Sequence, residues 1–147
     1  MKDMNGMDFK EKTILIVEDS PAQMLALQQT LAKAGLKVLW APDGQVGVFM
    51  AQQNLPDAIV LDIEMPRMDG FEACQHLKEN AQTASIPVIM LTAHANPATL
   101  TRGITLGALD FIPKDVFSGP VLLETLRQLN ILDDIAAAEE DRVAEEA

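Results

Sequence analysis

Five short apolar segments recur along the central part of the chain, separated by longer stretches in which hydrophobic residues follow helical spacing. Three of the short segments are apolar almost throughout rather than alternating, which is typical of parallel strands covered on both faces. We therefore expect parallel strands at Thr13–Val17, Lys37–Trp40, Ala58–Leu61, Val88–Leu91 and Asp110–Ile112.

Each longer stretch begins with a helix start signal, which is a capping side chain, a proline in the first turn, or both. Gly35 and Gly107 stand where helices should end. Cys74 falls on an apolar helix face and is expected in the core, whereas His76 should be exposed. Five strand–helix units predict an α/β fold, a doubly wound parallel sheet with helices on both faces. The start signals are Ser20-Pro21, Asp43, Asp69, Asn96-Pro97 and Gly119-Pro120.

Composition and charge narrow the functional classes. With 147 residues, 48% of them hydrophobic and 22% charged, the chain fits one globular domain. A single cysteine rules out a disulfide framework. A net charge of −11 argues against nucleic acid as a direct partner. The N-terminus lacks the apolar core of a signal peptide, and no apolar run approaches the ~20 residues of a membrane span, so we expect no membrane insertion and a cytoplasmic location.

The charge is unevenly distributed. The last 15 residues hold seven acidic side chains and one basic side chain, and their alanines and glutamates favour helix. We therefore expect a flexible leader over residues 1–11, one domain over residues 12–132, and an acidic, helical segment over residues 133–147.

Polar side chains follow the apolar runs where the expected strands end. The first run ends in Glu18-Asp19, the third in Asp62 and the fourth in Thr92, and Lys114 follows the fifth. The second run, which ends near Trp40, delivers no such group, as expected for an edge strand away from the site. In an open parallel sheet, ligands bind at this carboxyl edge.

These residue types suggest a chemistry. Three neighbouring carboxylates repel one another unless a cation intervenes, and hard oxygen ligands suit Mg²⁺. The lysine and the threonine suit phosphoryl oxygens, and a carboxylate can itself be the nucleophile that forms an aspartyl phosphate. The sequence therefore predicts a Mg²⁺-assisted, phosphoryl-accepting aspartate.

Four motifs occur in order: ILIVEDS at Ile14–Ser20, VLDIEMPRMDG at Val60–Gly70, MLTA at Met90–Ala93 and DFIPK at Asp110–Lys114. Together they resemble the receiver domain of two-component response regulators. The resemblance implies a flavodoxin-like sheet of order 2-1-3-4-5 and a phosphoprotein of a signalling or phosphorelay pathway.

The resemblance also assigns roles to individual residues. Asp62 would accept the phosphoryl group, Asp19 would bind Mg²⁺ directly, and Glu18 would act beside it through water. The backbone carbonyl of Glu64 would be a further metal ligand. Thr92 and Lys114 would contact the phosphoryl group, with the Ala93 amide beside them. Phe111 would be the aromatic that turns inward when the threonine moves.

Two positions depart from the common receiver pattern. Receivers usually carry a proline after the lysine, in a cis peptide that aims it, whereas Asp115 follows Lys114 here and Pro113 precedes it. A cis bond to a non-proline residue costs about 3–4 kcal/mol, so the geometry of this loop has to come from a structure. Phe111 stands where a tyrosine is frequent, so this position lacks a hydroxyl.

The implied partners are a sensor histidine kinase or a histidine phosphotransfer domain, and a downstream protein. We expect a stand-alone receiver that is not an enzyme beyond its own phosphorylation and dephosphorylation. The output surface would be the face of the fourth helix, fifth strand and fifth helix, roughly residues 96–132, through which a homodimer is an alternative to a partner. His94 and the side chain of Glu64 should lie at the rim of the site, beside the water that attacks the phosphoryl group.

Other classes remain as alternatives. A haloacid-dehalogenase-like phosphatase also uses a nucleophilic aspartate, but it wants Asp where Glu64 stands. Its nucleophile normally lies on the first strand of the domain, whereas about sixty residues precede Asp62 here. A flavin-binding flavodoxin needs a neutral first loop, and this one opens with Glu18-Asp19. A degenerate receiver used only for docking would lack the intact site.

Overall fold

The computed structural model describes residues 11–115 and 117–132. The predicted leader, apart from Glu11, and the predicted acidic helical segment at 133–147 therefore lie outside the described residues.

The centre of the fold is a parallel sheet of five strands in the order β2-β1-β3-β4-β5, which confirms the predicted topology. Four strands, β2 to β5, extend one residue beyond the predicted ends because the residue that follows each apolar run still pairs with the neighbouring strand. The strands are β1 (Thr13–Val17), β2 (Lys37–Ala41), β3 (Ala58–Asp62), β4 (Val88–Thr92) and β5 (Asp110–Pro113).

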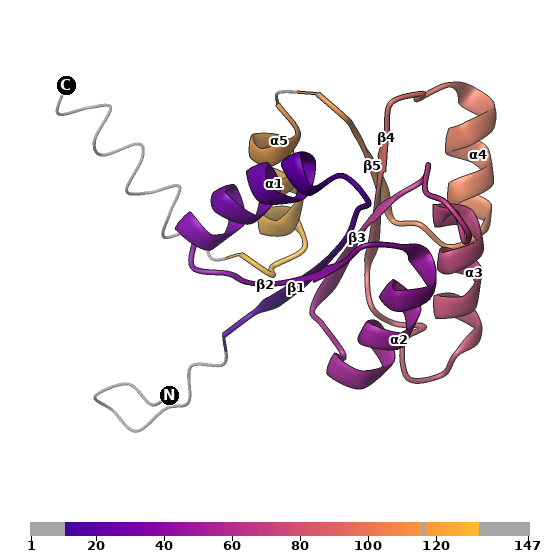
Figure 1. Ribbon diagram of the computed structural model, residues 1–147, viewed down its shortest axis with the longest axis horizontal. Helices are drawn as coiled ribbons and strands as arrows, with labels where there is room; N and C mark the ends of the chain where they lie inside the picture. Colours follow the sequence, from indigo (N-terminus) through magenta and orange to yellow (C-terminus); the bar gives the residue numbers. More distant parts are fainter. Residues whose placement is uncertain (1–10, 116, 133–147) are drawn as a thin grey trace, which may run out of the picture.

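Helices cover both faces of the sheet, with α1 and α5 on one face and α2, α3 and α4 on the other (Figure 1). Four helices begin at the predicted capping residues Ser20, Asp43, Asp69 and Asn96, whose side chains each accept a first-turn amide. The helices are α1 (Pro21–Lys33), α2 (Gly44–Asn54), α3 (Gly70–Glu79), α4 (Pro97–Thr105) and α5 (Ser118–Gln128).

The start of α5 differs from the prediction. The helix begins at Ser118, one residue before the Gly119-Pro120 pair, and it has no side-chain cap. The Ser118 hydroxyl instead forms hydrogen bonds with backbone groups of Pro113 and Asp115, which precede the helix. This loop therefore has a local architecture that the capping rules do not describe.

The core forms two layers, one on each side of the sheet. The side chains of β3 are buried from end to end, as the continuous apolar run predicts. Cys74 is buried on α3 and His76 is exposed, both as predicted. Because the central strands are buried in the core, the polar residues at their carboxyl ends are held in fixed positions.

None of the helices within residues 11–115 and 117–132 combines the length and the apolar character that a membrane span requires.

Candidate functional site

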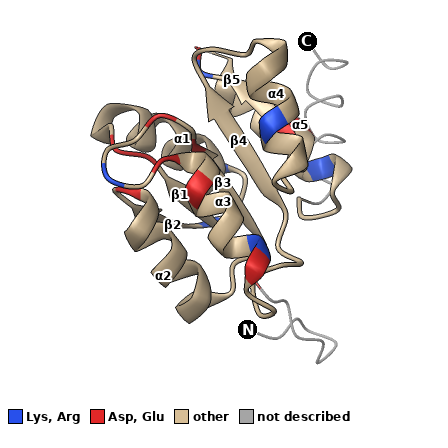
Figure 2. Cartoon of the chain, turned by 90° about the vertical axis from the view of Figure 1, so that its right-hand side faces the viewer, with Lys and Arg blue, Asp and Glu red and all other residues tan. Residues whose placement is uncertain are grey.

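The predicted site residues meet at the carboxyl edge of the sheet. Asp62 is the last residue of β3 and pairs with Leu91, and Thr92 is the last residue of β4 and pairs with Pro113. The parallel register thus brings the ends of neighbouring strands level with one another. Figure 2 shows acidic residues on the loops at this edge.

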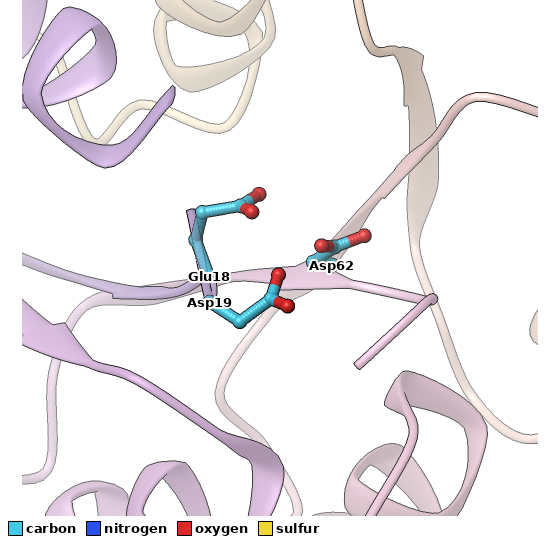
Figure 3. A group of neighbouring side chains, drawn as sticks. All are labelled: Glu18, Asp19 and Asp62. Atoms are coloured by element: carbon cyan, nitrogen blue, oxygen red, sulfur yellow. The ribbon is translucent and has the colours of Figure 1, made fainter. Parts of the chain in front are cut away.

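Three carboxylates form the centre of the site. Glu18 and Asp19 extend from the end of β1 to the side of Asp62 (Figure 3). Ligand oxygens of the three residues lie within 4.8 Å of one another. Glu18 and Asp62 are completely buried, whereas Asp19 is exposed. The group therefore has two buried acids and one acid that faces solvent.

Lys114 supplies the opposing charge. Its Nζ lies 2.7 Å from Oδ2 of Asp62 and 3.3 Å from Oε2 of Glu18. Burial alone would lower the pKa of Lys114, but the hydrogen bond and the charge of Asp62, together with Glu18, outweigh it and raise the pKa. Lys114 is therefore held as an ammonium ion at the site.

Glu18 lacks part of its hydrogen bonding. Its Oε1 accepts the Ser20 N–H at 3.0 Å, but its buried Oε2 has no hydrogen-bond donor among the described residues, although Lys114 lies within ion-pair distance. Burial, reinforced by the charge of Asp62 and opposed by Ser20 and Lys114, raises the pKa of Glu18 to about 7. A buried acceptor without a donor, beside two more carboxylates, fits a hard divalent cation such as Mg²⁺.

The β3–α3 loop folds closely over Asp62. Oδ1 of Asp62 accepts the Glu64 N–H at 3.1 Å, and the Gly70 N–H donates to Ile63 at 2.9 Å. A Cβ at Gly70 would collide with the carbonyl oxygen of Asp62, so only glycine allows this approach. The fold thus keeps the Glu64 backbone beside the Asp62 carboxylate.

Thr92 ends β4, and Ala93 and His94 follow it in the loop that leads to α4. Thr92 is buried, and its Oγ1 accepts the His94 N–H at 2.9 Å. Ala93 is exposed at the start of the loop. His94 Nε2 lies 3.6 Å from Oε1 of Glu64, so the two predicted rim side chains lie next to each other.

Phe111 lies in β5, three residues before Lys114, and is half-buried. Its ring contacts α4 at Gly103, where an added Cβ would collide with Cζ of the ring. The aromatic predicted to turn inward therefore already packs against the helix of the predicted output face.

Two features escaped the sequence analysis. The Trp40 indole donates a hydrogen bond of 2.7 Å to the backbone carbonyl of Glu18, so the edge strand β2 supports the acidic loop although it brings no charged or hydroxyl group to the site. The sequence around Trp40 does not indicate which backbone carbonyl its indole will contact. The described residues contain no cis peptide bond, so the Lys114–Asp115 bond is trans.

Comparison with known proteins agrees with this architecture. Residues 14–127 match the response regulator receiver domain family. The chain therefore belongs to the receiver domains of two-component signalling. The phosphatase alternative is not favoured by this membership.

Particular relatives fit the same class. The chain is 41% identical over 113 residues to protein PilH of Pseudomonas aeruginosa, a match that covers 77% of this chain and 93% of PilH. It is 39% identical to the response regulator PleD of Caulobacter vibrioides over 70% of this chain, but it spans only 23% of PleD.

Solved structures share the fold. The chemotaxis protein CheY4 of Vibrio cholerae superposes with a TM-score of 0.76 and 32% identity, over 81% of this chain and 98% of CheY4. The receiver domain of the histidine kinase PA1611 of P. aeruginosa superposes with a TM-score of 0.72 and 26% identity, over 80% of this chain and 97% of that domain. That domain was solved with a magnesium ion in its active-site cleft.

Proposed function

We propose that this receiver accepts a phosphoryl group on Asp62 in a Mg²⁺-dependent reaction. The observation that carries the proposal is the pairing of a fully buried Asp62 with the Lys114 ammonium at 2.7 Å, beside the carboxylates of Glu18 and Asp19. A buried carboxylate with one charged hydrogen-bond donor and two acidic neighbours is suited to accept a phosphoryl group, because the donor can also bind the oxygens of that group.

In the transfer step, a carboxylate oxygen of Asp62 attacks the phosphorus atom of a phosphohistidine. The new bond joins this oxygen to phosphorus, the phosphorus–nitrogen bond breaks, and the imidazole nitrogen leaves with the electron pair and later takes a proton from solvent. Lys114 and the Thr92 hydroxyl then donate hydrogen bonds to the phosphoryl oxygens. The Thr92 oxygen accepts the His94 N–H, which leaves the hydroxyl proton available for this bond.

The residues that would hold Mg²⁺ are Glu18, Asp19, Asp62 and the backbone carbonyl of Glu64. When bound, the ion neutralises negative charge on the carboxylates and on the transferred group. The Oε2 of Glu18, which lacks a hydrogen-bond donor among the described residues, and the exposed position of Asp19 support this assignment. The magnesium ion in the PA1611 receiver cleft supports it from a relative.

The donor would be a sensor histidine kinase or a histidine phosphotransfer domain, and the output would be binding to a downstream protein. We place the output on α4, β5 and α5, because Phe111 joins β5 to α4 through Gly103. A homodimer through the same face is the alternative readout. The protein would catalyse only its own phosphorylation and dephosphorylation.

The test is incubation with acetyl phosphate and Mg²⁺, followed by intact-mass measurement. We expect one phosphoryl adduct on the wild type and none on Asp62→Asn. Asp110→Asn is the matched control, because Asp110 is an exposed aspartate at the opposite end of β5, and it should label normally. Labelling of Asp62→Asn at the wild-type rate would overturn the assignment, and a wild type that neither binds Mg²⁺ nor labels would favour a docking-only receiver.

A further inference from the structure

A pocket of about 420 Å³ lies beside Lys114, between α1 and α5. Leu27 on α1 and Gly119 on α5 are among its lining residues, and Lys114 itself lines it. Because a pocket borders Lys114 on this side, packing does not by itself fix the direction in which this long side chain leaves the backbone. Hydrogen bonds hold the backbone on either side of Lys114.

Ser118, the first residue of α5, makes those hydrogen bonds. Its hydroxyl lies 2.7 Å from the carbonyl oxygen of Pro113, to which it can donate, and its Oγ accepts the N–H of Asp115 at 3.0 Å. The same Oγ lies 2.9 Å from the Asp115 carbonyl oxygen. A single hydroxyl thus connects the residue before Lys114 with the residue after it.

The rest of the loop closes around this hydroxyl. Asp115 accepts the Phe117 N–H on Oδ1 at 2.8 Å, and the Ser118 N–H donates to the Asp115 carbonyl at 3.2 Å. On the strand side, the Lys114 N–H donates to the Thr92 carbonyl at 2.9 Å. These hydrogen bonds hold the backbone at Lys114, although an aspartate and not a proline follows the lysine.

Ser118 itself stands on an anchored helix. Leu122 and Leu126 of α5 are completely buried in the core. Gly119 lies so close to α1 that an added Cβ would be 2.9 Å from Oγ1 of Thr30. Because α5 is packed in this way, the Ser118 hydroxyl at its first residue is held in a fixed position relative to the loop.

We propose that Ser118 is a positioning residue for Lys114, and that its hydroxyl holds the lysine so that Nζ reaches Asp62 and the incoming phosphoryl group. The proposal rests on the proposed phosphorylation of Asp62. A misplacement of about 1 Å in a reacting group can slow a reaction about 100-fold, so loss of this hydroxyl should act on the rate of phosphorylation.

The experiment compares wild type, Ser118→Ala, Ser118→Thr and Thr105→Ala. Thr105→Ala is the matched control, because it removes a hydroxyl bonded to a backbone carbonyl at 2.8 Å on α4, away from Lys114. The rate of labelling is measured by intact mass at saturating acetyl phosphate and Mg²⁺. Mg²⁺ affinity and thermal midpoint are measured on the same samples.

We expect Ser118→Ala to label on the order of 10- to 100-fold more slowly, with Mg²⁺ affinity and thermal midpoint like those of Thr105→Ala. Ser118→Thr keeps the hydroxyl and should stay within a few-fold of the wild type. Amide hydrogen exchange of Asp115 in the wild type should be slow, and it should accelerate in Ser118→Ala.

Equal labelling rates in Ser118→Ala and Thr105→Ala would overturn the positioning role while leaving Asp62 as the acceptor. A rate loss accompanied by an equal loss of Mg²⁺ affinity would overturn it too, because the whole site would then be disturbed. If Ser118→Ala does not fold, rapid exchange of the Asp115 amide in the wild type overturns it and slow exchange supports it. A wild type that does not label at all overturns the proposed function instead.

Discussion

The indole Nε1 of Trp40 donates a hydrogen bond to the backbone carbonyl of Glu18 across 2.7 Å, and this bond joins the edge strand to the loop that carries two of the three clustered carboxylates. Trp40 is the single tryptophan of the chain. The only indole therefore lies next to the proposed metal site.

Intrinsic fluorescence should consequently report Mg²⁺ binding. We expect a saturable change in Trp40 emission when Mg²⁺ is added, because neutralising Glu18 and Asp19 changes the electrostatic field at the indole. Asp19→Asn should shift the midpoint of the titration to higher Mg²⁺, and Asp110→Asn should not. An unchanged midpoint in Asp19→Asn would place the ion elsewhere.

Thermal stability should rise with Mg²⁺. A ligand at ten times its Kd adds roughly 1.4 kcal/mol to the free energy of unfolding, which raises the midpoint of a domain of this size by a few degrees. Scanning calorimetry should show this rise in the wild type and much less of it in Asp19→Asn. The same rise in both proteins would contradict the carboxylate site.

Stability without Mg²⁺ should depend on the titration of Glu18. Its pKa is raised from 4.5 to about 7 in the folded chain, so between these values the folded state binds more protons than the unfolded state. The free energy of unfolding should therefore fall as pH rises through this window, by at most about 1.4 kcal/mol per pH unit from this group. Other groups also titrate, so the measured quantity is the difference between wild type and Glu18→Gln.

Urea unfolding in a chelator at several pH values between 5 and 7.5 measures this difference. Added Mg²⁺ should reduce it, because a bound cation favours the carboxylate form. A parallel pH dependence in wild type and Glu18→Gln would show that Glu18 titrates normally.

Thr92 should couple phosphorylation to the output face. Thr92→Ala should still be labelled at Asp62, because Thr92 is not the acceptor. Amide chemical shifts on α4, β5 and α5 should change on phosphorylation in the wild type and hardly at all in Thr92→Ala. Thr101→Ala, an exposed threonine on α4, is the control. If Thr92→Ala shows the same chemical-shift changes as the wild type, the threonine does not carry the signal, and the output would lie on another surface, such as the β3–α3 loop.

The sequence predicts the fold and the main site because both depend on regular patterns. Apolar runs such as Ala58–Leu61 specify buried parallel strands, and such strands bring Asp62 and Thr92 to one edge. Four of the five helix starts are predictable for the same reason, since a capping residue such as Asp69 accepts an amide three residues along the chain.

The remaining features depend on contacts between distant residues. Trp40 and Glu18 are 22 positions apart, and no spacing rule joins an indole to a carbonyl. Ser118 bonds to Pro113 within a loop whose residues fit no standard cap. Side-chain donors that hold backbone groups are determined by three-dimensional packing, and these are the contacts that periodicity does not encode.

The contact between Gly103 and the ring of Phe111 means that α4 and this ring share one volume beside Met90. If the ring leaves, it opens a void whose cost in free energy grows with its size. If α4 gains a single methyl group at this position, the ring or the helix has to shift. In the proposed switch, the missing side chain of Gly103 is thus what leaves room for the inward ring, at a residue that is neither a proposed metal ligand nor a phosphoryl contact.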